Sequence, residues 1–177
     1  MGALSTRPHP LHRGDAVLSS KLSVGIHILT IFALKPGEIL TSEFLACSVN
    51  TNPVVIRRLL GSLRTAEIVE SRTGVGGGWS LLIDPERITL LDILRAVEPQ
   101  DELFALHRSA PNPECPCGLH IQSVLTEVYD KVQDGMTRQL AGITIACIAG
   151  KIRERMAVCP EQGIIPNRGG GTRGSTL

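Results

Sequence analysis

Apolar residues recur at steps of three and four positions along the first third of the chain, which predicts a series of amphipathic helices. The first covers 20–34 and ends before Pro36-Gly37. A second, shorter helix is expected over 42–47. A third begins at Pro53, which suits the first turn of a helix because its missing N–H would have no partner there. Two helices joined by a short polar turn predict a helix-turn-helix unit.

The third helix is predicted to present two different faces. Its basic residues, Arg57, Arg58 and Arg64, fall mostly away from the apolar positions. The inward stripe is predicted to consist of Val55, Leu59, Leu60 and Leu63. A helix that enters the major groove of DNA typically carries polar and cationic side chains near its start. Asn52, Val54, Arg57 and Arg58 occupy these positions here.

Two strand-like pieces, 68–71 and 79–83, follow and are joined by the glycine-rich segment 72–78. A nucleotide-binding loop leads from a strand into a helix, whereas this loop leads into a strand. We interpret it as a hairpin tip whose glycines allow positive backbone angles and a close approach to DNA, with Arg72 as the nearby cation. A plain structural hairpin is the alternative. Trp79 is expected to pack in the core or the hairpin rather than to stack on a ligand.

The order of helix, helix, turn, helix and hairpin is that of a winged helix-turn-helix unit. This order favours DNA contact by Arg57 and Arg58 over the alternative that adjacent arginines occupy a solvated helix face. A further helix is predicted behind a Thr89 cap and stops near Pro99. The proline-rich segment 110–116 then breaks the chain.

A long helix is predicted from Leu119 to about Met136, and it carries a single apolar stripe. The stripe consists of Ile121, Val124, Leu125, Val128 and Val132. Such a stripe lies outside the DNA-binding unit and has little to bury against in its own subunit. A second copy of the chain is the expected partner, and these residues are the predicted dimer interface.

The predicted fold is mainly α with a small β-hairpin wing, that is, a winged helix-turn-helix domain followed by a long dimerisation helix. The predicted divisions are a flexible leader (1–18), the DNA-binding domain (19–100), a connecting loop (101–117), dimerisation helices (118–158) and a disordered tail (159–177).

Composition narrows the class of protein. The 177 residues are 42% hydrophobic but only 3% aromatic, so aliphatic side chains must supply the core. The net charge of +1 excludes a global basic field, and between 19 and 82 a modest excess of Lys and Arg over Asp and Glu lies in the half predicted to bind DNA. No apolar run is long enough to cross a bilayer, and the chain begins without the apolar core of a signal peptide. A cytoplasmic protein that does not engage membranes is expected.

The five cysteines lack the spacing of a disulfide scaffold or of a zinc site. Cys115 and Cys117 precede the long helix, where a disulfide between them could shift the geometry of the two subunits. Three interpretations stay open for this pair: inert thiols, a redox switch, or a metal site completed by His107, His120 and Glu114. Cys147 is expected to be packed in an apolar run.

No arrangement of residues typical of an enzyme is found. The sequence has no G-x-S-x-G elbow, no H-E-x-x-H motif and no acid pair spaced for acid–base chemistry. A non-enzymatic function is therefore expected.

Several of these segments also resemble one known family. The segments are Lys21-Leu22-Ser23, 48–60, 74–79 and 88–93. In this order they resemble the Rrf-type winged-helix transcriptional regulators, which include the iron–sulfur cluster regulator, the nitric-oxide-sensing repressor and the cysteine-metabolism repressor. The resemblance covers roughly 19–150 and implies a homodimer in which a long C-terminal helix crosses its partner.

The resemblance implies contacts between double-stranded DNA and the start of the first helix, the helix-turn-helix and the wing. The implied DNA-binding residues are Lys21, Ser23, Thr41, Ser42, Asn52, Pro53, Val54, Arg57, Arg58, Arg72, Gly76, Gly77, Gly78 and Trp79.

Cofactor binding is where the sequence departs from the cluster-binding members of this family. Those members carry three cysteines in the loop before the dimer helix, whereas this chain has only Cys115 and Cys117 there. We therefore expect no iron–sulfur cluster and no other cofactor, and we place the chain in the clusterless branch.

These observations predict a sequence-specific transcriptional regulator, a repressor, that binds a palindromic operator as a homodimer and responds to an oxidant or a small molecule. Two alternatives stay open. One is a cysteine-based redox or metal sensor whose winged helix contacts another protein, and the other is a small metal or redox enzyme.

Overall fold

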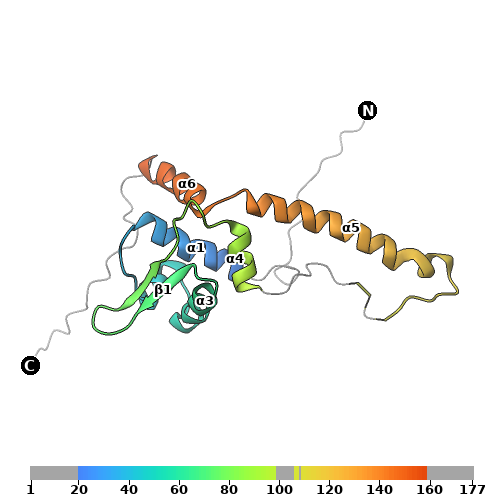
Figure 1. The fold of residues 1–177 in the computed structure, drawn as a ribbon, viewed down its shortest axis with the longest axis horizontal. Coiled ribbons are helices and arrows are strands. Elements are labelled where there is room, and N and C mark those ends of the chain that lie inside the picture. The colour runs from blue at the N-terminus through green and yellow to red at the C-terminus, as the bar shows by residue number, and fades with distance from the viewer. Residues whose placement is uncertain (1–19, 99–105, 108, 159–177) are drawn as a thin grey trace, which may run out of the picture.

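A computed structural model describes residues 20–98, 106–107 and 109–158, which form helices around a central α1 and one antiparallel hairpin (Figure 1). The elements are α1 (Ser20–Leu34), α2 (Ser42–Val49), α3 (Pro53–Thr65), β1 (Val69–Arg72), β2 (Gly78–Leu81), α4 (Leu90–Val97), α5 (Pro116–Ala141) and α6 (Ile145–Val158). The predicted fold class, mainly helical with a small hairpin, is confirmed. The predicted leader and tail lie outside the described residues.

The core surrounds α1, which packs against α2, α4 and α6. Ile28, Leu29 and Phe32 on α1 are fully or almost fully buried. Helix α6 returns to this core, and its Arg153 donates a hydrogen bond of 2.7 Å from Nη2 to the carbonyl of Ala33. A carbonyl in the last turn of a helix has no partner within the helix, so this bond both caps α1 and anchors α6.

The turn of the helix-turn-helix is bounded by two asparagines. Asn52 is the N-cap of α3 and Pro53 occupies its first turn. Asn50 ends α2 in the left-handed conformation, with φ of 57°. Asn tolerates this conformation better than most residues, so the short turn between α2 and α3 is sharply defined.

The predicted inward stripe of α3 is wrong at one position. Val55 is 45% exposed, whereas Ile56 is fully buried together with Leu59, Leu60 and Leu63. Both residues are apolar and adjacent, so periodicity alone could not decide between them. The helix is rotated so that the longer side chain of Ile56 fills the core.

The wing is a two-stranded hairpin in which Val69 pairs with Leu81 and Arg72 with Gly78. Leu40, just before α2, extends the sheet through two 2.9 Å backbone hydrogen bonds with Trp79. The helix-turn-helix and the wing are therefore joined by main-chain hydrogen bonds.

Thr89 is the predicted cap of α4, where it forms a capping box with Asp92. The predicted stop at Pro99 lies outside the described residues. Helix α5 is longer than the sequence predicted. It begins at Pro116 and continues past Met136 to Ala141. Met136 and Leu140 pack against the core, which explains the extra turn at this end.

Cys147 does not occupy the packed position that the sequence suggested. On α6 the buried residues are Ile145 and Ala149, one turn apart, whereas Cys147 between them is exposed. An apolar run on a helix still has an outer face, and Cys147 lies on it. Among the described helices, none combines the length and apolarity needed to span a membrane.

Candidate nucleic-acid interface

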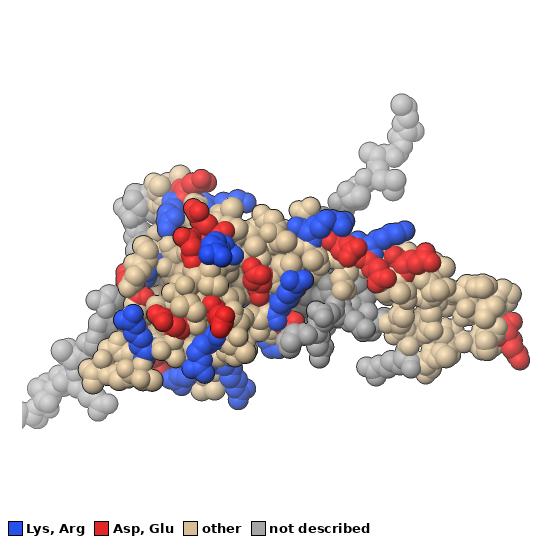
Figure 2. Space-filling model, viewed as in Figure 1, with Lys and Arg blue, Asp and Glu red and all other residues tan. Residues whose placement is uncertain are grey.

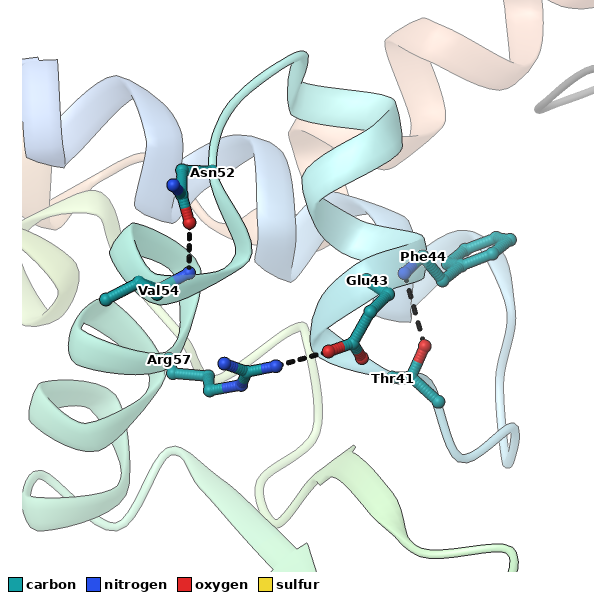
Figure 3. A network of polar contacts seen from close by, with 6 residues as sticks. All are labelled: Thr41, Glu43, Phe44, Asn52, Val54 and Arg57. Carbon is teal, nitrogen blue, oxygen red and sulfur yellow. Dashed lines mark hydrogen bonds and ion pairs between the residues drawn. The ribbon is translucent and has the colours of Figure 1, made fainter.

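The start of α3 is the centre of the candidate interface. The side chain of Asn52 accepts a 2.8 Å hydrogen bond at Oδ1 from the N–H of Val54 (Figure 3). Val54 is 48% exposed, and Arg57 follows it about one helical turn later. These residues form an accessible end of the helix in which polar, apolar and cationic groups lie side by side.

Arg57 is held by Glu43 of α2, a contact that the sequence did not suggest. The guanidinium Nη2 of Arg57 donates to Oε1 of Glu43, and both side chains are more than half exposed (Figure 3). Hydrogen bonding to its own backbone N–H and then to Arg57 lowers the pKa of the Glu43 carboxyl. The carboxylate is therefore ionised at neutral pH, and it fixes Arg57 while cancelling part of its charge.

Arg58 is also exposed on α3. Within the part of the chain that the structure describes, no carboxylate lies within ion-pair distance of it. Arg58 can therefore offer its full charge and its planar set of donors to an external acceptor.

The N-terminus of α2 lies beside this end of α3. Thr41 caps it, because Oγ1 accepts a 3.2 Å hydrogen bond from the N–H of Phe44 (Figure 3). Ser42 is only 5% exposed, so its hydroxyl is not available at the surface. Backbone N–H groups at such a terminus attract anions, and Thr41 places them next to Arg57.

The glycines of the wing have different structural roles. Gly74 and Gly76 have φ values of 97° and 77°, which residues with a side chain rarely adopt. Gly77 has no positive φ, but a Cβ there would lie 2.4 Å from the carbonyl oxygen of Arg72. Residues 74–77 therefore form a compact turn in which only the fully exposed Val75 carries a side chain.

The wing and α3 are joined by Arg64, which was not among the predicted site residues. Its Nη1 donates to Ser71 Oγ at 3.2 Å, and its guanidinium lies 5.9 Å from the centre of the Trp79 ring. Trp79 is half-buried against the core, as expected from the sequence. Arg72 at the end of β1 is exposed and lies 3.9 Å from Glu70.

Lys and Arg side chains lie on this part of the molecule. Figure 2 shows Lys and Arg side chains along the lower edge of the domain, where Figure 1 places α3 and the wing, with acidic side chains among them. The exposed cations of these elements are Arg57, Arg58, Arg64 and Arg72. The cations on this edge are therefore partly neutralised, by Glu43 and Glu70.

Two of the predicted DNA-binding residues lie on α1 rather than on the edge formed by α3 and the wing. Lys21 is 3.4 Å from Oε1 of Glu98, at the end of α4. Ser23 is exposed and precedes His27 by one turn, and His27 Nε2 lies 3.3 Å from Ser48 Oγ at the end of α2. Ser23 therefore lies on the face of α1 that meets the helix-turn-helix, whereas Lys21 pairs with Glu98 at the end of α4.

The N-terminus of α5 carries the cysteine pair. Cys115 is the N-cap residue and Cys117 lies in the first turn, and both are exposed. Hydrogen bonding from the backbone N–H groups of Gly118 and Cys117 lowers the pKa of the Cys115 thiol. A lowered thiol pKa raises the fraction of the reactive thiolate form at neutral pH.

Helix α5 carries no buried residue along its length of 26 residues. Val128 and Val132 are 47% and 49% exposed, and Val124 is exposed as well. Ile121 and Leu125 are partly covered. All five residues of the predicted stripe share one side of a helix that extends away from the domain (Figure 1).

These features define a winged helix-turn-helix DNA-binding protein. They are the adjacent helices α2 and α3, the exposed arginines of α3 and the glycine-tipped hairpin beside them. The chain belongs to the Rrf2 family, whose model is described as an iron-dependent transcriptional regulator and matches residues 18–151. The resemblance inferred from the sequence is thereby confirmed.

Individual relatives agree with this assignment. A Bacillus subtilis protein named "Putative HTH-type transcriptional regulator YwnA" is 48% identical over 125 residues, which span 71% of this chain and 91% of that protein. A crystal structure described as that of a "putative DNA binding protein" is 39% identical, with a TM-score of 0.58, and covers 73% of this chain and 98% of its own. The structure of the global cysteine regulator CymR of B. subtilis is 24% identical, with a TM-score of 0.60, over 76% and 96% of the two chains. The named relatives are regulators of transcription and not enzymes.

The iron dependence in the description of the family requires donor side chains that lie close together. Cys115 and Cys117 are the two thiols at the α5 N-terminus. Across 20–98, 106–107 and 109–158, no three His, Cys, Asp or Glu side chains come together as a metal-binding group. The described residues therefore do not fit an iron site or an iron–sulfur cluster.

Proposed function

We propose that this regulator binds a two-fold symmetric operator as a homodimer and represses transcription from it. The observation that carries the proposal is the exposed apolar stripe of α5, beside a domain whose other helices have buried faces. An isolated helix with one apolar face gains little stability in water, and pairing with a second copy would cover that face. A pair related by a two-fold axis would present two copies of α3 to the DNA.

Each protomer would contact DNA in three ways. Arg58, Asn52 and Val54 would reach base edges from the start of α3. The N-terminus of α2 at Thr41 and the cation Arg72 would hold phosphates on either side. The glycine-tipped wing would lie against the backbone or the minor groove, because few side chains prevent its approach.

Fluorescence anisotropy with a labelled duplex from the promoter upstream of this gene tests the proposal. We expect the affinity to fall by about a thousandfold or more between 50 and 200 mM salt, because phosphate contacts release counterions. A duplex of the same composition but shuffled sequence is the control, and it should bind more weakly. Absence of binding to either duplex at low salt would contradict the proposal and would favour a winged helix that contacts protein.

A redox response is the second part of the proposal, and the lowered pKa of the exposed Cys115 thiol beside Cys117 supports it. Hydrogen peroxide would accept two electrons and two protons from the pair, forming a Cys115–Cys117 disulfide and two water molecules. We expect oxidation to change the operator affinity of the wild type but not of Cys117→Ser. Cys47→Ser, which changes an exposed thiol on α2, is the matched control and should respond like the wild type. An identical response in Cys117→Ser would rule out this pair as the switch.

A further inference from the structure

A pocket of about 440 Å³ opens between the end of α3, the start of the wing and α4. Its apolar walls are Ile68, Ile83 and Ile88, of which Ile68 and Ile88 are only 3% and 1% exposed. This volume lies within the usual range for small-molecule sites, which is about 300–1,000 Å³. The pocket is separate from the exposed start of α3 and from the cysteines of α5.

The charged lining of the pocket is unbalanced. Arg87 and Arg95 line it together with a single carboxylate, that of Asp92. Asp92 Oδ2 is already occupied, because it accepts hydrogen bonds from the N–H and the hydroxyl of Thr89 at 2.9 and 2.6 Å. Among the residues that the structure describes, neither arginine has a carboxylate within ion-pair distance. Two guanidinium groups therefore remain available beside an apolar cavity.

The wall of this pocket is the connection between α3 and the wing. Ala66 is the C-cap of α3 and lines the pocket. The N–H of Ile68 donates to the carbonyl of Leu63 in α3, and the carbonyl of Ile68 accepts from the N–H of Leu82 beyond β2, both at 3.0 Å. A shift of Ile68 would therefore be transmitted by backbone hydrogen bonds to both DNA-facing elements.

This connection also contains an unusual backbone conformation. Glu67, between Ala66 and Ile68, has φ of 57°, which residues other than glycine rarely adopt. Such a residue keeps its conformation only while its surroundings hold it there. The pocket wall is thus a segment whose conformation a bound molecule could change.

We propose that this pocket binds a small organic carboxylate with an apolar body, and that its occupancy changes the affinity for the operator. The carboxylate would pair with Arg87 and Arg95, and the apolar body would pack on the isoleucines. Arg is well suited to this role, because its planar donors match the two oxygens of a carboxylate. The regulatory half of this inference rests on the proposed function, whereas the binding half does not.

Binding is tested with benzoate, phenylacetate and hexanoate, followed by the methyl NMR signals of the isoleucines in the full chain. We expect at least one acid to shift the signals of Ile68, Ile83 and Ile88 to saturation and to leave that of Ile28, in the core around α1, unchanged. The neutral amide of that acid, which has nearly the same shape, should bind about tenfold more weakly, because it lacks the charge-assisted hydrogen bonds. Absence of a saturable shift with all three acids, or equal binding of acid and amide, would overturn the proposal.

Substitution of the arginines locates the site. Arg95→Gln and Arg87→Gln should each weaken binding of the acid by about tenfold, the effect of one lost charge-assisted hydrogen bond. Arg155→Gln, which removes an exposed arginine of α6, is the matched control and should bind like the wild type. Unchanged binding in both pocket variants would overturn the assignment. A pocket variant that altered the sedimentation coefficient would also overturn it, because the pocket would then be a contact between protein chains.

Operator anisotropy with and without the bound acid tests the regulatory half. We expect saturation of the pocket to change the operator affinity of the wild type at least threefold, and we expect no such change in Arg95→Gln at the same acid concentration. If the free protein binds the operator and the saturated protein binds it equally well, the regulatory half is wrong and the proposed function stands. If the free protein does not bind, the proposed function fails, while the NMR result still decides the binding half.

Discussion

The winged-helix domain and α5 use similar aliphatic residues in opposite ways. In the domain, Leu60, Leu63 and Ile93 are fully buried, and the helices that carry them cover one another. On α5, Val124, Val128 and other apolar residues of similar size remain exposed along one side. Apolar area is stabilising only when it is removed from water. The domain therefore buries its apolar side chains within one chain, whereas the described residues leave much of the apolar stripe of α5 exposed.

The substitution with the largest expected effect lies in the core of the winged-helix domain. Leu60→Ala should lower the free energy of unfolding by about 2–5 kcal/mol, because it removes buried methyl groups and leaves a cavity. Urea denaturation followed by circular dichroism measures this difference. Val55→Ala, a truncation on the exposed side of the same helix, is the control and should cost less than about 0.5 kcal/mol beyond helix propensity. Equal losses in the two variants would mean that the orientation assigned to α3 is wrong.

The second effect concerns α5. Val128→Asp should weaken dimerisation by about a hundredfold or more, because a carboxylate would replace a methyl surface on the seam between two copies. Sedimentation velocity over a concentration series measures the change. Asp130→Ser, on the same helix but outside the stripe, should leave the dimer intact. A Val128→Asp protein that stays dimeric would place the interface on another surface.

The third effect concerns the end of the domain that faces DNA. Arg58→Ala should weaken operator binding by about 1–3 kcal/mol if its guanidinium contacts a guanine, with a smaller loss for shuffled DNA. The unfolding transition should not change, since Arg58 is exposed. Arg155→Ala, on α6, is the matched control in the anisotropy assay. Equal affinities of Arg58→Ala and the wild type would exclude Arg58 from the interface.

The smallest effect concerns the ion pair between α2 and α3. Glu43→Gln should tighten binding to shuffled DNA a few-fold, because it removes a negative charge near the phosphates. It should also reduce the preference for the operator, because Arg57 loses the contact that orients it. Since the pKa of the Glu43 carboxyl is lowered, the effect should persist from neutral pH into the acidic range in which an ordinary glutamate becomes protonated. Glu38→Gln, an exposed carboxylate in the loop before α2, is the control. An unchanged preference would show that Arg57 needs no support from Glu43.

The parts of this fold that could be predicted from the sequence are those set by local chemistry. Asn52 followed by Pro53 marks the start of α3, and Thr89 with Asp92 marks the start of α4, because capping is decided within a few residues. The glycines after Arg72 likewise indicate the hairpin. Such signals were sufficient for the order of elements and hence for the fold class.

The parts that could not be predicted depend on contacts between distant segments. The Arg57–Glu43 pair and the Leu40–Trp79 bridge join residues whose proximity no spacing rule encodes. Cys147 was misjudged because an apolar run does not reveal which side of its helix meets the core. The stripe of α5 was visible in the sequence, but only the fold shows how little of it the described chain covers.

The stoichiometry of the DNA complex tests the central claim, which is that α5 pairs two chains so that two copies of α3 bind one site. Sedimentation equilibrium with a full operator duplex and with a half-site duplex of equal length measures it directly. The account predicts two chains on the full operator and a much weaker complex on the half-site. The Val128→Asp protein should bind the two duplexes with equal affinity. One chain bound equally well to both duplexes would contradict it.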